Sequence, residues 1–218
     1  MNKTTLLSLI GGIAVAFAAL FGGVWAANSL MAPATVPTEQ LDATYMPEGR
    51  AVTDFELVDH NGDAFTPQDL EGNWDLVFFG FTHCPDMCPT TMAELRRVQD
   101  MLAEDNRADA VDVVFITVDP ERDTPERMKD YVTGFDASFT GVTGSLDAID
   151  VLARDLGIAH TRHNDDVEEG ENYDVDHGLA VLLINPEGRL QAMFGSPHDA
   201  TSIEDDLTTI LDAHGTAL

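Results

Sequence analysis

The chain holds only two cysteines, Cys84 and Cys88, which stand four positions apart in the motif HCPDMCP. A deprotonated cysteine is both a nucleophile and a metal ligand. At this spacing the two sulfurs could close a disulfide or converge on one metal ion, so the spacing alone does not choose between them. A purely structural disulfide is the less favoured interpretation, because so short a loop constrains little chain entropy.

His177 is the candidate third ligand. It falls at the start of a predicted strand that should neighbour the strand over residues 76–81, and this would bring its imidazole near the cysteines. Two thiolates and an imidazole form a soft ligand set that suits copper, Cu(I) in particular, and three ligands leave room for exchange with a partner. Zinc is the competing metal, but structural zinc normally takes four ligands. His83 or an aspartate could supply a fourth.

The two cysteines should lie where a buried strand meets a helix. Residues 76–81 are an unbroken apolar run, as expected of a central strand covered on both faces. Pro89 suits the first position of a helix, and apolar residues then recur at helical spacing. A helix N-terminus favours the thiolate form of a nearby cysteine. His83 and Met87 flank the cysteines, but neighbours at a turn often point apart, so we leave both out of the predicted ligand set.

The remaining elements follow from periodicity and turn residues. Helices are predicted around Asp123 and Glu126, which resemble a capping box, after a cap at Ser145, and at the C-terminus. Strands are predicted at residues 52–57, 64–66, 111–118, 158–161, 178–184 and 188–194. Strands that alternate with crossover helices and end in an antiparallel pair indicate an α/β fold with a mixed sheet between helices. We therefore predict a thioredoxin-like α/β/α sandwich that opens with an N-terminal β-hairpin.

The N-terminal residues predict a membrane anchor ahead of this domain. Residues 6–27 carry no charge, and a helix of that length at ~1.5 Å per residue would cross a ~30 Å hydrocarbon layer. A cleavable signal peptide usually has a shorter apolar core, although small residues near Ala27 keep cleavage open. Lys3 lies before the span, which orients the domain outward. We expect a single-pass inner-membrane anchor over residues 1–27, a linker over 28–47 and a periplasmic domain over 48–218.

The composition is strongly acidic. The chain has 39 Asp and Glu against 11 Lys and Arg, a net charge of −28. This charge excludes nucleic-acid binding, which needs clustered basic residues. Two interpretations stay open: adaptation to a saline habitat, or an acidic surface that steers a basic partner.

Three sequence blocks resemble the Sco/SenC proteins. They are residues 80–89 (GFTHCPDMCP), residues 118–125 (VDPERDTP) and residues 175–177 (VDH), which occur in this order and span essentially the whole domain. A departure at Gly178, where the family more often has a larger or hydroxyl-bearing residue, leaves the ligands untouched. The resemblance implies a thioredoxin-like fold and copper ligation by Cys84, Cys88 and His177. It also implies a role in assembling the dinuclear copper centre of cytochrome c oxidase subunit II.

The resemblance leaves two functions in competition. The first is a metallochaperone that binds one copper ion and delivers it to subunit II, and it is not an enzyme in the strict sense. The second is a membrane-anchored thiol–disulfide oxidoreductase that reduces the acceptor cysteines, with Cys84 and Cys88 as its catalytic pair. Thioredoxin-type reductases usually have two residues between their cysteines and a cis-proline opposite, and this sequence shows neither feature. A periplasmic copper donor or thiol reductase is the further expected partner.

Several other residues are weaker candidates. Asp119, Asp123 and Asp176 could support a metal-bound imidazole from the outer shell, although turn formation and capping explain them nearly as well. His160 and His163 border the acidic run at 164–174 and suggest a second metal site. We favour a solvated loop there that controls access to His177.

Overall fold

The computed structural model describes residues 36–163 and 173–215. The predicted anchor at residues 1–27 and most of the acidic run at 164–174 lie outside these residues. Within the described part of the chain, no helix is both long and apolar enough to cross a membrane. Residues 36–210 form one compact unit, which contains the sheet and the candidate site.

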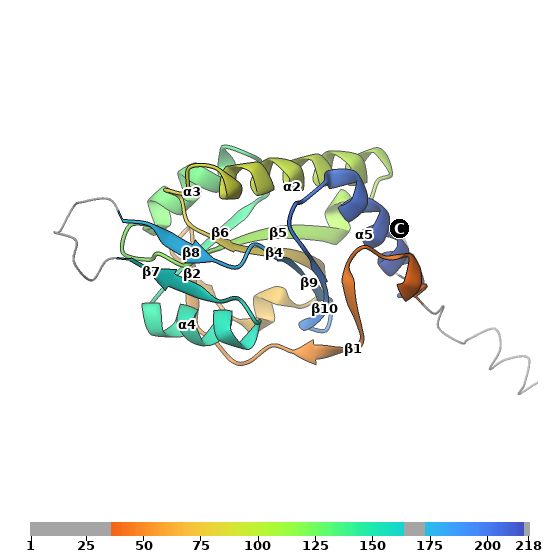
Figure 1. The fold of residues 1–218 in the computed structure, drawn as a ribbon, viewed down its shortest axis with the longest axis horizontal. Helices are drawn as coiled ribbons and strands as arrows, with labels where there is room; N and C mark the ends of the chain where they lie inside the picture. The colour runs from red at the N-terminus through yellow and green to blue at the C-terminus, as the bar shows by residue number, and fades with distance from the viewer. Residues whose placement is uncertain (1–35, 164–172, 216–218) are drawn as a thin grey trace, which may run out of the picture. The chain divides into compact units, whose positions relative to one another are not determined.

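A mixed sheet of eight strands forms the centre of this unit (Figure 1). Its spatial order is β1-β10-β9-β4-β5-β6-β2-β3. The strands are β1 (Thr44–Ala51), β2 (Leu57–Asp59), β3 (Ala64–Phe65), β4 (Trp74–Gly80), β5 (Val111–Thr117), β6 (Thr140–Thr143), β9 (Val181–Asn185) and β10 (Arg189–Phe194).

The middle of the sheet matches the prediction from its apolar runs. β4 is buried at every position and runs parallel to β5, with Phe78 opposite Phe115. Its other neighbour is β9, which is antiparallel. A strand flanked on both sides, with helices over both faces, can expose neither face to water, and this explains its continuous hydrophobic sequence. The structure therefore confirms β4 as the central strand that leads into the cysteine motif.

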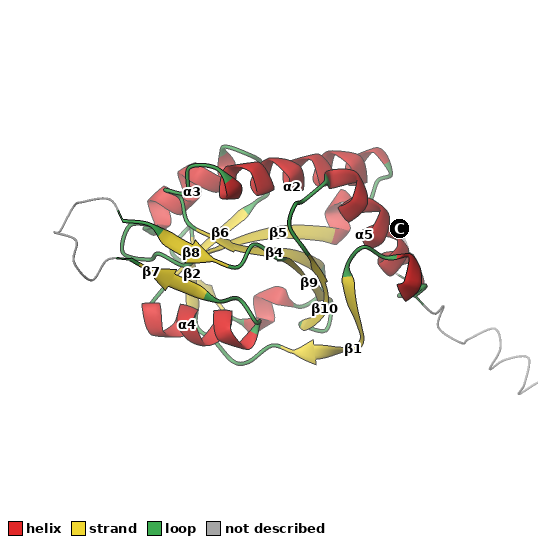
Figure 2. Ribbon diagram, in the orientation of Figure 1, coloured by secondary structure: helices red, strands yellow, loops and turns green. Residues whose placement is uncertain are grey.

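Helices lie on both sides of this sheet (Figure 2). α2 (Met87–Glu104) and α3 (Pro125–Thr133) are on one side, and α4 (Leu146–Asp155) is on the other; α5 (Ala200–Ala213) follows β10. Short 3-10 helices occur at Thr38–Gln40, Pro67–Leu70 and Ala108–Ala110. Ser145 caps α4 as predicted, because its side chain accepts a hydrogen bond from the Ala148 N–H.

Two helix starts differ from the predictions. α2 begins at Met87, so Pro89 lies inside its first turn, where a missing N–H also breaks no helical bond. α3 is capped by Thr124, whose side chain accepts from the Arg127 N–H. The predicted cap, Asp123, instead points into the protein and is fully buried.

The N-terminal part of the unit contains more structure than we predicted. The hairpin of β2 and β3 is present around the Asn61-Gly62 turn, but its first strand begins at Leu57 rather than at residue 52. β1 begins at Thr44, inside the segment predicted as a linker up to residue 47, and pairs antiparallel with β10. The ordered unit thus starts before residue 48. β6, which follows α3, was also missed because its Thr-Gly-Val-Thr sequence is short and only partly apolar.

His177 lies on a separate ribbon and not on the main sheet. β7 (His160–Arg162) and β8 (Val175–His177) pair antiparallel with each other, and His160 stands opposite His177. We predicted that His177 begins the strand beside β4; it instead ends β8, and β9 begins four residues later and occupies the place next to β4. His177, as the last residue of β8, therefore reaches β4 from this ribbon, and its ring contacts Phe78 of β4.

Candidate metal centre

The structure brings Cys84, Cys88 and His177 together. Their ligand atoms all lie within 4.8 Å of one another, and the Cys88 Sγ is 3.3 Å from the His177 Nε2. Donors that bond one ion at about 2.0 to 2.3 Å stand at most roughly 4.6 Å apart. The three donors are thus almost close enough to share one ion, with a change of only a few tenths of an ångström. Two sulfurs and one imidazole nitrogen suit copper.

The two thiols differ sharply in their surroundings. The Cys84 sulfur is half-buried and accepts hydrogen bonds from the Cys88 thiol and from the Cys88 N–H, the latter at 3.4 Å. Donation from the Cys88 thiol is the largest cause that lowers the pKa of Cys84, to about 5. Cys88 is fully buried, and its donation to Cys84 together with burial raises its own pKa far above the ordinary value. Cys84 is therefore the thiolate of the pair in the metal-free protein.

Two phenylalanines and a backbone carbonyl orient His177. Its ring makes edge contacts with Phe78 and Phe81, at centroid distances of 6.0 and 5.9 Å. Its Nδ1 is 3.0 Å from the Gly178 carbonyl oxygen, which can only accept, so Nδ1 carries the proton. This tautomer leaves the lone pair of Nε2 directed toward Cys88. Such an outer-shell bond fixes ring orientation in metal sites.

Asp123 holds the loop that carries the cysteines. Its carboxylate is fully buried and accepts from the Thr82 N–H at 2.9 Å and from the hydroxyls of Thr82 and Thr117 at 2.5 and 2.6 Å. The Nδ1 of His83 is 3.8 Å from it, and the His83 side chain is about a third exposed. Asp123 thus holds the backbone at Thr82, two residues before Cys84, and its charge is one of the causes that raise the pKa of the Cys88 thiol.

Asp119 anchors the entry to β8 through two residues that sequence reasoning missed. The buried Asp119 carboxylate accepts hydrogen bonds from Arg122 and from the Tyr173 hydroxyl. The Arg122 guanidinium lies 3.6 Å from the centre of the Tyr173 ring and 5.7 Å from that of Phe81. A cation over an aromatic face is stabilising. The arginine in the second sequence block was the only signal that could have pointed to this cluster.

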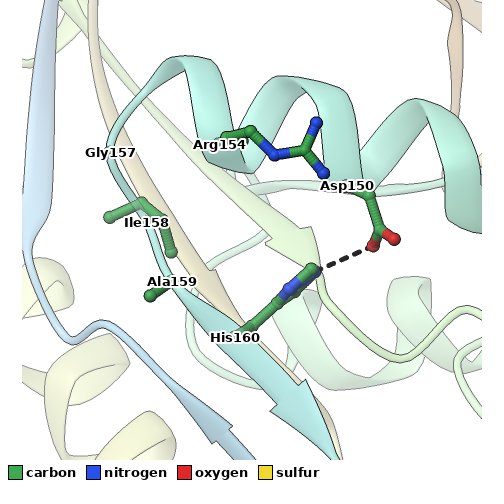
Figure 3. A pocket seen from close by; sticks show the side chains of 6 residues that line it. All are labelled: Asp150, Arg154, Gly157, Ile158, Ala159 and His160. Carbon is green, nitrogen blue, oxygen red and sulfur yellow. Dashed lines mark ion pairs between the residues drawn. The ribbon is translucent and has the colours of Figure 1, made fainter.

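The remaining histidine candidates are engaged in pairs. His160 Nε2 is 3.0 Å from the Asp150 carboxylate, and Figure 3 shows this pair spanning from α4 to β7, with Arg154 beside it on the helix. His163 Nε2 is 2.8 Å from the Asp176 carboxylate, so Asp176 faces His163 rather than His177. In residues 36–163 and 173–215, the only group of three or more candidate ligands is the one formed by Cys84, Cys88 and His177.

Comparison with known proteins agrees with this site. Residues 43–212 match the SCO1/SenC family model, which covers most of the chain. The chain belongs to the SCO1/SenC family. The resemblance drawn from the three sequence blocks is thereby confirmed.

Individual SCO1/SenC relatives resemble the chain over most of its domain. A Stutzerimonas stutzeri protein is 36% identical over 80% of this chain and 83% of its own length. The mitochondrial SCO2 homolog of Homo sapiens is 38% identical over 71% of this chain, but only 57% of its own length is spanned. The copper-bound crystal structure of Arabidopsis thaliana ScoI matches with a TM-score of 0.67 at 34% identity, covering 74% of this chain and 98% of that one. The thioredoxin-like α/β fold is thereby supported.

Proposed function

We propose that this protein binds one copper ion through Cys84, Cys88 and His177 and delivers it to the dinuclear copper site of cytochrome c oxidase subunit II. The observation that carries the proposal is the convergence of two sulfurs and one imidazole nitrogen within 4.8 Å. The copper-bound structure of the relative ScoI supports copper as the metal.

The donor set explains both binding and release. Thiolate and imidazole are preferred copper ligands, and three protein ligands leave the ion accessible to an incoming ligand. The His177 tautomer already presents Nε2, and Cys84 is already ionised, so uptake of copper has only the Cys88 proton to displace. A chaperone needs such a site, because its metal must enter and leave without unfolding of the protein.

Copper titration of the purified full-length chain tests the metal site. We expect one equivalent of Cu(II) to produce strong sulfur-to-copper charge-transfer absorption, and electron spin resonance to show nitrogen coupling. His177→Ala should lose that coupling and bind copper at least tenfold more weakly. His163→Ala is the matched control, because His163 also belongs to the β7–β8 region but pairs with Asp176 instead. Wild-type affinity in His177→Ala would contradict the proposed ligand set.

The cellular setting is part of the same proposal. We infer a single-pass anchor in the inner membrane, a domain in the periplasm, and a periplasmic copper donor or thiol reductase as the upstream partner. The uncharged run at residues 6–27 and the charge distribution around it support this setting. Membrane fractionation, followed by protease treatment of spheroplasts, should find the chain in the membrane and its domain cleavable from outside. Recovery of the whole chain in the soluble cytoplasmic fraction would contradict it.

Thiol–disulfide exchange is the second candidate, and the unequal thiols favour it. The Cys84 thiolate would attack a disulfide of the acceptor, form a mixed disulfide and release one acceptor thiolate. Cys88, after losing its proton, would then attack the Cys84 sulfur and release the second acceptor thiolate, which leaves Cys84 and Cys88 joined by a disulfide. The acceptor gains two electrons in this sequence.

The two functions separate at His177, because exchange needs only the sulfurs. An oxidase-assembly assay should lose activity in both Cys84→Ser and His177→Ala if copper delivery is the function. Activity that survives His177→Ala but not Cys84→Ser would favour exchange and would contradict the chaperone proposal.

A further inference from the structure

His198 lies in the segment between β10 and α5, far from the cysteine motif in sequence, and yet it contacts the backbone two residues beyond His177. Its Nε2 is 2.6 Å from the carbonyl oxygen of Leu179, two residues beyond His177. A carbonyl only accepts, so the proton of the His198 ring sits on Nε2. The Nδ1 of His198 is buried and has no hydrogen-bond partner among the described residues. Within this part of the chain, the hydrogen bond from Nε2 is therefore the one that the ring makes, and it holds the backbone next to His177.

The same ring also packs on a residue that touches His177. His198 makes an edge contact with Phe78 at 6.3 Å, and Phe78 makes an edge contact with His177 at 6.0 Å. Phe78 is thus flanked by two imidazoles. Edge-to-face contacts between rings are stabilising, so each contact favours the observed placement of its two rings.

The segment between β8 and β9 makes three hydrogen bonds that bear on His177. The Gly178 N–H donates to the Ala159 carbonyl at 2.8 Å, and the Gly178 carbonyl accepts from His177 itself. The Leu179 carbonyl accepts from His198. His198 thus adds a side-chain hydrogen bond to a segment that is otherwise held at its two ends, by the β7–β8 ribbon and by the pairing of Val181 in β9.

His198 is in turn fixed from the cysteine-bearing helix. Glu94 of α2 accepts a hydrogen bond from the Ala200 N–H at 3.0 Å, which ties the His198 segment to the element that begins at the two cysteines. The His198 segment is therefore linked both to α2, which carries Cys88, and to the backbone that follows His177.

We infer that His198 is a positioning residue, which holds His177 in the orientation that places its Nε2 at the two sulfurs. It acts through its hydrogen bond to the Leu179 carbonyl, with the Phe78 ring as a secondary contact, and does not touch the metal. The inference rests on the proposed function in one respect only, namely that His177 binds copper.

Two substitutions separate the hydrogen bond from the packing. His198→Phe keeps a ring against Phe78 and removes the N–H donor. His198→Gln removes the ring and keeps an N–H donor at a reach similar to that of Nε2.

Loss of one hydrogen bond of ordinary strength corresponds to roughly fivefold to tenfold in an equilibrium constant. We expect the copper dissociation constant of His198→Phe to rise by about that factor, with weaker nitrogen coupling in electron spin resonance. His198→Gln should restore both to within about twofold.

The metal-free protein gives a second readout. Nitrogen NMR of the imidazoles should show His177 with its proton on Nδ1 in the wild type and in His198→Gln, and with a mixture of tautomers in His198→Phe. His163→Phe serves as the control that changes a histidine outside this contact chain. Melting temperatures identify any variant that fails to fold.

The outcomes distinguish the two claims. A wild-type chain that takes up no copper contradicts the proposed function, while the NMR comparison still decides the role of His198. Unchanged copper affinity and unchanged His177 tautomer in folded His198→Phe would overturn the inference. It would be overturned equally if His198→Gln behaved like His198→Phe.

Discussion

The unequal thiols predict an unusual pH dependence of alkylation. Cys84 should react with iodoacetamide as a thiolate down to about pH 5, because its pKa is lowered from 9.0 to about 5, chiefly by the hydrogen bond from the Cys88 thiol. Cys88 should stay unmodified, because it is fully buried and held protonated. Mass spectrometry of the digested, reduced protein reads the two sites separately.

The size of the effect follows from two opposing factors. At pH 5.5 a thiol of pKa about 5 is roughly three-quarters ionised, whereas one of pKa 9.0 is ionised to about 0.03%, a ratio of about 2400. A less basic thiolate is less nucleophilic, and a Brønsted coefficient near 0.45 over about four pKa units costs roughly 60-fold. Cys84 should thus react about 40-fold faster than a model thiol of pKa 9.0 at pH 5.5, and only about 1.6-fold faster at pH 7.

The shape of the profile is the decisive result. The rate should be flat above about pH 6 and fall below it, with a midpoint near 5. Cys88→Ala removes the main donor, so its midpoint should move toward that of an ordinary thiol. A wild-type rate that climbs tenfold per pH unit from 6 to 8, or equal modification of Cys88, would refute the assigned ionisation.

Two further predictions concern the central sheet. Burial is the largest cause that raises the pKa of Asp75, from 3.8 to about 8, so the folded state keeps a proton that the unfolded chain releases and stability falls as pH rises from about 4 to 8. The free energy of unfolding of Asp75→Asn should equal that of the wild type near pH 4 and exceed it at pH 8 by a few kcal/mol, with about 5 kcal/mol as the upper limit. Urea unfolding at both pH values measures this difference, and equal free energies at pH 8 would contradict the prediction. Gly80→Ala would place a Cβ 2.6 Å from the Phe115 ring and 2.9 Å from the Cys88 sulfur. Because such a close approach forces neighbouring atoms to move, the substitution should lower the free energy of unfolding by about 1–3 kcal/mol and weaken copper binding. Gly144→Ala is the control, because its Cβ would meet the flexible end of a leucine side chain away from the site. Equal copper affinity in folded Gly80→Ala and Gly144→Ala would show that the sulfur had not moved.

The sequence predicted correctly those elements whose signals lie within their own residues. The apolar run of β4 and the cap at Ser145 each report the structure formed by their own neighbours in sequence. β1 was missed because its pairing partner, β10, lies far along the chain and its own sequence includes a proline and a glycine. Edge strands of this kind depend on the partner more than on their own pattern.

The site divides in the same way. The cysteines were placed by their own motif, and His177 was brought to them as expected, although on a ribbon that the sequence did not separate from the main sheet. The residues that hold His177 in place could not be predicted from local sequence. Tyr173 and His198 act through contacts between distant segments, and a lone tyrosine or histidine carries no spacing signal that would single it out.

The separate β7–β8 ribbon has a consequence for how an ion could depart. The sulfur donors lie at the junction of β4 and α2, whereas the nitrogen donor lies on the β7–β8 ribbon, which shares no ladder with the eight-stranded sheet in the described part of the chain. Under the proposed function, movement of this ribbon relative to the sheet would withdraw the imidazole while both sulfurs stayed in place. The position that His177 leaves would then be open to a donor atom of the acceptor protein.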